Sequence, residues 1–126
     1  MLVLVQGFHS IEEYMGEIWV DFPPARFLCS LVSDDPLTGF LIINIGLFGF
    51  GLWCWLFPVR GQYYYAQSLV WFWIALGLIN GMGHTLWSII QRAYTPGLWT
   101  APILFLIATV LIRKQLNANS NVQQGA

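Results

Sequence analysis

The chain has 126 residues, a formal net charge of −1, 57% hydrophobic residues and only 9% charged residues. A charge this close to zero gives no indication of a nucleic-acid partner. Cys29 and Cys54 are too few to suggest a disulfide framework. Uncharged apolar segments recur along the chain, and roughly 20 such residues cross about 30 Å of hydrocarbon. We therefore predict an all-α, polytopic membrane helix bundle of about four transmembrane helices over residues 1–114.

Residues 1–19 are predicted to form the first membrane helix, with its polar side turned into the bundle. The segment starts with apolar residues and then carries His9, Glu12 and Glu13. No basic residue precedes the apolar stretch, as one would in a secretory signal peptide. An ionisable side chain inside a lipid-embedded helix is costly to keep, so these three residues form a functional-site hypothesis by default.

A loop is expected over residues 20–36, because the Pro23–Pro24 pair breaks a helix. The loop ends with Asp34 and Asp35, followed by a further proline. An aspartate in this position accepts hydrogen bonds from the first free N–H groups of a helix. We expect these aspartates to mark the turn into the second membrane helix and to help cap it.

Three more membrane helices are predicted, over residues 37–57, 67–91 and 97–112. The first of these is expected to stop at Pro58, because proline cannot continue the helical hydrogen-bond pattern. A turn rich in proline and glycine separates the last two. The tail, residues 115–126, is polar and rich in Asn and Gln, and it is expected to be disordered.

Four spans place both termini on the same side of the membrane. That side carries Arg60, Arg113 and Lys114, whereas the opposite side carries Arg26 and Arg92. Cytoplasmic loops hold an excess of Lys and Arg. The sequence therefore predicts an integral membrane protein with both termini in the cytoplasm.

Helical spacing groups the ionisable residues of the first segment. Glu12 is three residues and Glu13 four residues beyond His9, so both carboxylates can lie on the same side of the helix as the imidazole. Glu17 lies four residues beyond Glu13 and is expected to extend this stripe. The pattern predicts one polar helix face.

A second polar group lies in the helix predicted over residues 67–91. Asn80 and His84 are four residues apart on one face of that helix. The first and third helices run in the same direction, and a rise of about 1.5 Å per residue brings the two polar groups to similar depths. Two histidines and two carboxylates that converge in a bundle can bind a metal, or can form a proton relay or an acid–base pair.

These motifs also resemble a known family. The block His9–Tyr14 is similar to the motif that names the HXXEE-domain family of small integral membrane proteins. The blocks Asn80–His84, Arg92–Gly97 and Thr100–Pro102 resemble its C-terminal half, in which an Asn and a His precede a Tyr-x-Pro-Gly turn. The resemblance covers roughly residues 5–112. It implies a multi-helix membrane protein and no particular reaction.

The first functional hypothesis is a metal-dependent intramembrane enzyme, a hydrolase or an oxidase that acts on a lipid-like substrate. His9, Glu13 and His84 would bind the metal, and Glu12 or Glu13 would serve as the catalytic base. Imidazole and carboxylate ligands suit zinc or iron. In this hypothesis the bilayer surrounds the site and supplies the substrate.

The second hypothesis is a non-catalytic accessory subunit of a larger membrane complex. The polar residues would then form a helix-packing network that includes Asn80, Glu17 and Tyr94, and other membrane protein subunits would be partners. A proton-coupled transporter is a third and weaker hypothesis, because four spans without internal repeats would have to oligomerise to form one.

Overall fold

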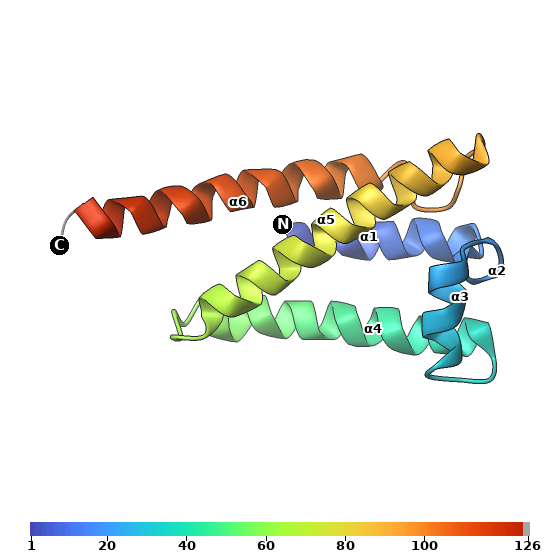
Figure 1. Cartoon of the computed structure of the whole chain (residues 1–126). Helices are drawn as coiled ribbons and strands as arrows, with labels where there is room; N and C mark the ends of the chain where they lie inside the picture. The colour runs from blue at the N-terminus through green and yellow to red at the C-terminus, as the bar shows by residue number, and fades with distance from the viewer. Residues whose placement is uncertain (125–126) are drawn as a thin grey trace.

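The computed structural model describes the backbone of residues 1–124 and the side chains of residues 1–117. Those residues form six α-helices and one π-helical turn, and no strand. Four long helices run roughly along one axis (Figure 1). They are α1 (Leu2–Met15), α4 (Pro36–Cys54), α5 (Ala66–Gln91) and α6 (Ala101–Gln124).

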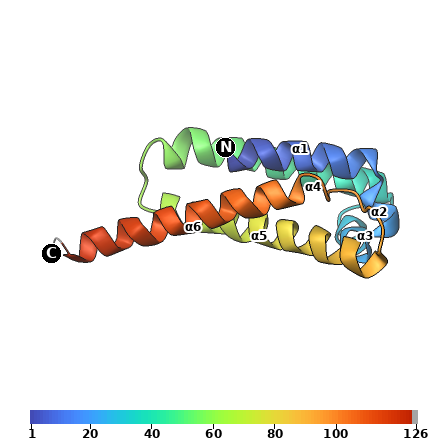
Figure 2. The same ribbon diagram turned by 90° about the horizontal axis from the view of Figure 1, so that it is seen from above.

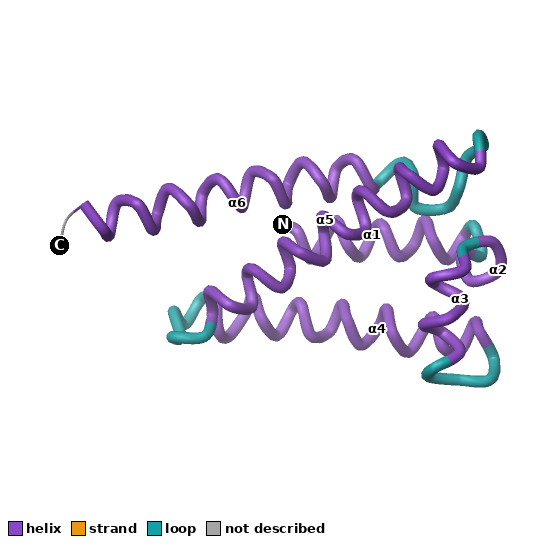
Figure 3. The backbone as a smooth tube through the Cα atoms, in the orientation of Figure 1, coloured by secondary structure: helices purple, strands orange, loops and turns teal. Residues whose placement is uncertain are grey.

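Chain direction alternates along these four helices. Helix α1 lies above α4 in Figure 1, and it covers α4 when the molecule is seen from above (Figure 2). The short helices α2 (Ile18–Asp21) and α3 (Pro23–Ser30) lie together at one end, here named the α3 end. The π-helical turn η1 (Trp55–Val59) continues α4 at the other end, here named the π-turn end. The turns between the long helices gather at these two ends (Figure 3).

Two helical segments are long and apolar enough to cross a membrane. They are Pro36–Val59, which joins α4 to η1, and Ala66–Gln91, which is α5. Helix α1 has 14 residues, which corresponds to about 21 Å. The all-α fold is confirmed over the described residues and two candidate spans are found, whereas the full set of four spans stays a prediction.

Helix α4 begins as the sequence predicts. The Asp35 carboxylate accepts hydrogen bonds from the Thr38 N–H, at 2.9 Å, and from the Thr38 hydroxyl, at 2.6 Å. Pro36 occupies the first turn, where its missing N–H costs nothing. The expected cap is therefore confirmed for Asp35.

The loop predicted over residues 20–36 is wrong for most of that range, since helix α3 occupies residues 23–30. Pro23 and Pro24 begin this helix instead of breaking it. Proline is favoured in the first turn because its φ is already helical and its N–H is not needed there. Helix α3 packs on the start of α4, where a Cβ on Gly39 would lie 2.3 Å from the carbonyl oxygen of Cys29.

The later helix ends also differ from the sequence expectation. Pro58 does not stop the second span, because the chain widens into a π-helical turn in which Arg60 N–H donates to Trp55 O at 3.3 Å. Helix α6 begins at Ala101 and continues to Gln124, whereas residues 115–126 were expected to be a disordered tail. No Pro or Gly lies between residues 113 and 124 to break it. Residues 125–126 of the expected tail lie outside the described residues.

Helices α5 and α6 approach each other closely at Gly77 and Gly81. A Cβ on Gly81 would lie 2.7 Å from Phe105 Cβ and 2.9 Å from the carbonyl oxygen of Ala101. A Cβ on Gly77 would lie 3.4 Å from Ala108 Cβ. Small residues spaced four apart let two helix backbones come near each other.

Large apolar side chains face outward along all four long helices. Phe8 is 66% exposed, Ile45 69%, Ile79 68% and Leu106 63%. A soluble monomer rarely shows so much apolar surface. The buried core is correspondingly small and forms two clusters, one of Leu2, Trp73 and Leu104 and the other of Ile18, Cys29 and Phe40.

Candidate metal centre

Three ligand-type side chains meet between α1 and α5. The donor atoms of His9, Glu13 and His84 all lie within 4.8 Å of one another. His84 Nε2 is 3.1 Å from Glu13 Oε1, and His9 Nε2 is 3.5 Å from the same oxygen. Both imidazoles are buried, and the Glu13 side chain is 12% exposed. The structure therefore brings together the three residues that the sequence predicted as metal ligands.

The neighbours of His84 fix which of its nitrogens carries the proton. His84 Nδ1 lies 2.8 Å from the carbonyl oxygen of Pro96. A carbonyl oxygen only accepts hydrogen bonds, so Nδ1 must be the protonated nitrogen. In the neutral ring, Nε2 then presents its lone pair to Glu13.

The neighbours of His9 lead to the same assignment. His9 Nδ1 lies 2.7 Å from the Thr100 hydroxyl oxygen, which lies 2.7 Å from Glu12 Oε2 and 3.4 Å from the Gly97 carbonyl. The ionised carboxylate is the nearer acceptor, so the hydroxyl donates to Glu12 and accepts from His9 Nδ1. His9 Nε2 has no hydrogen-bond partner among the described side chains. It is a buried lone pair that faces Glu13.

With both rings neutral, three electron-pair donors converge without a proton between them. Such a group is unfavourable unless a cation or added protons lie among the donors. Zinc bonds of about 2.0–2.2 Å would place the ligand atoms of a tetrahedron about 3.3–3.6 Å apart. The separations of 3.1 and 3.5 Å from Glu13 Oε1 are close to that spacing, and the ligand nitrogens of the two histidines lie within 4.8 Å of each other. The residues therefore fit a divalent transition metal.

Glu12 lies beside the group, but its carboxylate faces the segment that leads into α6. It accepts hydrogen bonds from the Tyr94 hydroxyl at 2.9 Å, from the N–H groups of Trp99 and Thr100 at 3.0 Å each, and from the Thr100 hydroxyl. Four donors leave this carboxylate fully occupied. Its role as a catalytic base stays a prediction, and these contacts favour a positioning role.

Tyr94 is the far end of this network. Burial, together with the hydrogen bond to Glu12 and the negative charge of that carboxylate, raises the pKa of Tyr94 to about 12. The phenol therefore keeps its proton and donates to Glu12 at any ordinary pH. The sequence had placed Tyr94 in a polar network without identifying its partner.

Gly97 lets the loop between α5 and α6 reach both histidines. Its φ is +92°, and a Cβ there would lie 2.6 Å from His84 Nδ1 and 2.8 Å from His9 Cε1. The two imidazole rings are edge-to-face, with centroids 4.6 Å apart. The ring of Phe22 lies 5.4 Å from that of His84. Backbone and aromatic atoms therefore shield the rings from water.

Two other residues that the sequence predicted as part of the polar network, Asn80 and Glu17, lie outside the centre. The Asn80 amide donates to Gln6 Oε1 at 3.1 Å, a link between α5 and α1. Glu17 is exposed and has a φ of 51°, because α1 ends at Met15. Glu17 therefore does not continue the helical stripe, contrary to the sequence expectation.

Sequence reasoning missed Gln6, Pro96 and Thr100 as members of this network. Gln6 carries a usable signal, since it lies three residues before His9 on the same helix face. Thr100 is 91 residues from His9, and Pro96 is 12 residues from His84. No spacing rule relates positions that are joined by a folded loop.

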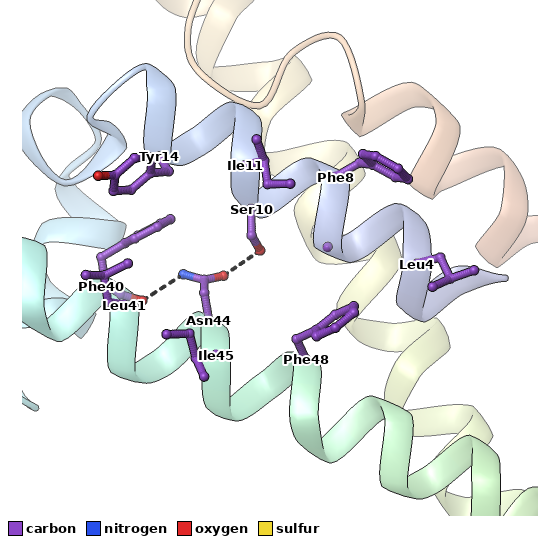
Figure 4. Close-up of a pocket in the computed structure, with 11 residues that line it drawn as sticks. Leu4, Phe8, Ser10, Ile11, Tyr14, Phe40, Leu41, Asn44, Ile45 and Phe48 are labelled. Atoms are coloured by element: carbon purple, nitrogen blue, oxygen red, sulfur yellow. Dashed lines mark hydrogen bonds between the residues drawn. The ribbon is translucent and has the colours of Figure 1, made fainter.

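A separate apolar groove of about 410 Å³ lies between α1 and α4. It contains a polar pair, in which the Ser10 hydroxyl donates to Asn44 Oδ1 at 2.6 Å and the Asn44 amide donates to Phe40 O at 3.1 Å (Figure 4). The groove is on the other face of α1 from His9 and Glu13. It is not part of the metal centre.

Comparison with known proteins identifies a family. No curated protein and no solved structure matches the chain. The model of a family described as "Protein of unknown function with HXXEE motif" matches residues 1–112. This match covers both the α1 motif and the α5–α6 segment that form the centre. The chain therefore belongs to the HXXEE family.

Proposed function

We propose that this chain is an integral membrane protein that binds one divalent transition-metal ion and uses it on a lipid-like substrate. One observation supports the proposal most directly. The Nδ1 atoms of His9 and His84 are both engaged in hydrogen bonds, so both Nε2 lone pairs meet Glu13 Oε1. Metal-binding histidines usually donate their other ring N–H in this way.

The donor set narrows the choice of ion. Two imidazoles and one carboxylate are the ligands of a class of catalytic zinc sites, and also of the facial triad that binds non-haem iron(II). An ion bound by three protein ligands keeps open positions and supplies a Lewis acid for a carbonyl or phosphoryl oxygen. Zinc or iron is therefore proposed, and a catalytic role is favoured over a closed structural site.

The other residues of the network position these ligands. Thr100 orients His9 and is itself held by Glu12, whereas the Pro96 carbonyl orients His84. Glu13 is the partly exposed ligand, with a 12% exposed side chain. We place it on the side from which a substrate enters.

The membrane placement supports a lipid-like substrate. Helices α4 and α5 are the candidate spans, and the outer surface of the four long helices is apolar. Molecules that reach this surface are those dissolved in the bilayer. The start of α1 and the distal part of α6 point toward the π-turn end (Figure 1), with Arg60 and Lys114 among the basic residues there, so we place both termini in the cytoplasm.

Metal content tests this proposal. The full chain is purified in detergent, loaded with Zn²⁺ or with Fe²⁺ without oxygen, and measured by elemental mass spectrometry. Glu13→Gln keeps the shape of the ligand and removes its charge, and Glu17→Gln is the matched control at an exposed position on the same segment. We expect about one ion per chain in the wild type and in the control, with loss in Glu13→Gln.

The opposite outcomes are equally clear. A wild type that binds neither ion, or a Glu13→Gln chain that retains it fully, would overturn the metal centre. The group would then be a helix-packing network, as in the accessory-subunit hypothesis. Helical circular dichroism and monodispersity separate loss of metal from loss of fold. His9→Ala and His84→Ala repeat the test at the other two ligands.

A further inference from the structure

A second cavity, of about 470 Å³, lies at the π-turn end, far from the metal ligands. It is bounded by the start of α1, the end of α4, the start of α5 and the middle of α6. Its wall includes Leu2, Gly51, Leu69, Trp73, Val110 and Lys114. The volume is within the range of roughly 300–1,000 Å³ that is typical of small-molecule sites. Trp73 and Lys114 supply polar groups in a largely apolar wall.

Trp73 supplies an unpaired hydrogen-bond donor. Its side chain is 5% exposed, and Nε1 has no hydrogen-bond partner among the described side chains. A buried indole N–H usually finds an acceptor. The edge of the Trp73 indole that carries Nε1 and Cζ2 packs against Gly51. A Cβ added to Gly51 would lie 2.7 Å from Trp73 Cζ2. Since Gly51 and Trp73 both line the cavity, this unpaired N–H lies next to the space that a ligand would occupy.

Lys114 supplies a positive charge in the same wall. It is exposed and lies on α6, and it borders the cavity together with Leu69 and Trp73, which are one helical turn apart on α5. A lysine of this kind extends its ammonium toward the membrane surface while its stem contacts apolar groups. The cavity wall therefore includes both an exposed cationic residue and a buried hydrogen-bond donor.

The charges of the whole chain are divided between the two ends. All six acidic residues lie between positions 12 and 35, in the half of the sequence that forms the end of α1, the short helices and the turn into α4. Arg26 and Arg92 are the basic residues at that same end, whereas Arg60 follows η1, and Arg113 and Lys114 are adjacent on α6. A membrane surface rich in anionic lipid attracts such a basic end.

We propose that this cavity binds an anionic glycerophospholipid. One acyl chain occupies the apolar cavity, an ester carbonyl accepts a hydrogen bond from Trp73 Nε1, and Lys114 pairs with the phosphate. The proposal uses the membrane placement and is independent of the metal centre.

Lipid titration followed by native mass spectrometry tests the headgroup contact. The full chain in detergent is titrated with phosphatidylglycerol and with phosphatidylcholine of the same acyl chains. We expect phosphatidylglycerol to bind more tightly, and Lys114→Gln to weaken its binding about fivefold. Arg113→Gln is the matched control, because it removes the same charge from the adjacent residue, which is not in the cavity wall. Equal binding of the two lipids, or equal effects of the two variants, would overturn the headgroup assignment.

A diether analogue of phosphatidylglycerol, which lacks the ester carbonyls, tests the hydrogen bond to Trp73. The wild type should prefer the diester form, and Trp73→Phe should abolish that preference while still binding both. Val110→Trp should fill the cavity and weaken both forms. A preference for the diester that survives Trp73→Phe would overturn the proposed hydrogen bond. If oleate displaced phosphatidylglycerol at equal concentration, the ligand would be a free fatty acid, and the proposed phospholipid site would be overturned.

Discussion

His84 Nε2 lies 3.1 Å from Glu13 Oε1, while the other nitrogen of the same ring lies 2.8 Å from the Pro96 carbonyl oxygen. One imidazole on α5 is thus fixed between a carboxylate on α1 and the loop that precedes α6. The arrangement gives different roles to the two glutamates of the motif. Glu13 meets both histidines, whereas Glu12 binds the loop and reaches His9 only through Thr100.

Thr100→Val tests whether the hydroxyl positions His9. The valine keeps the side-chain shape, but His9 Nδ1 loses its acceptor and the Glu12 carboxylate loses one donor. We expect metal affinity to fall about 10–100-fold, as for other groups that orient a metal ligand. Competition with a chelating dye measures the affinity. Thr100→Ser should restore most of it, and a serine variant as weak as the valine variant would argue for a packing role alone.

Gly97→Ala tests the close passage of the loop past the two imidazoles. An alanine at φ +92° is strained by at least about 1–2 kcal/mol, and its Cβ would displace His84 and His9. We expect a lower thermal unfolding temperature in detergent together with loss of metal. Gly46→Ala is the control, because a Cβ there meets nothing within 4 Å and its backbone is helical. Similar behaviour of the two variants would contradict the proposed geometry.

Gly81→Ala tests the contact between α5 and α6. The added methyl would lie 2.7 Å from Phe105 Cβ and 2.9 Å from Ala101 O, so the helices must separate. Overpacking of this kind costs typically 1–3 kcal/mol. Gly83→Ala, two residues along the same helix, meets nothing within 4 Å and should be neutral or stabilising. The thermal unfolding temperatures of the two variants are compared. If Gly83→Ala were destabilised and Gly81→Ala were not, Gly81 would not lie at the contact between α5 and α6.

Tyr94 should titrate at a higher pH than an ordinary tyrosine. Its pKa is raised from the ordinary value of 10.0 to about 12, first by partial desolvation of a side chain that is still 53% exposed, and then by the hydrogen bond to Glu12 and the charge of that carboxylate. Because the folded pKa lies above the unfolded one, the stabilising contribution is complete below about pH 10 and is lost as the pH rises through 12. The tyrosinate absorbance of the wild type minus that of Tyr94→Phe isolates this group.

The same titration in Glu12→Gln should give a lower pKa for Tyr94, although not the full return to 10, because burial is the larger cause. Glu17→Gln is the control and should leave the Tyr94 curve unchanged. If Glu12→Gln also left it unchanged, the hydrogen bond between Tyr94 and Glu12 would not exist in solution.

Sequence rules were most reliable for contacts in which both residues lie on the same helix or at its end. The spacing of four residues predicted that Glu13 would meet His9, and Asp35 before Pro36 predicted a cap on α4. The expectation for Glu17 failed because Gly16 ends α1, and a spacing argument applies only while the helix continues. Pro23 was misjudged because proline both stops and starts helices.

The sequence by itself determined the helical fold, the long apolar segments α4 and α5, and the choice of His9, Glu13 and His84 as candidate ligands. These follow from apolar length and from the 3.6-residue period, which act over a few turns of one chain segment. Only the tertiary structure decided that Thr100 and Pro96 would orient the two histidines, and that Glu12 would bind the loop instead of joining the ligands. Those contacts depend on the path of the loop around Gly97, whose positive φ and missing side chain let the backbone pass between rings from two helices.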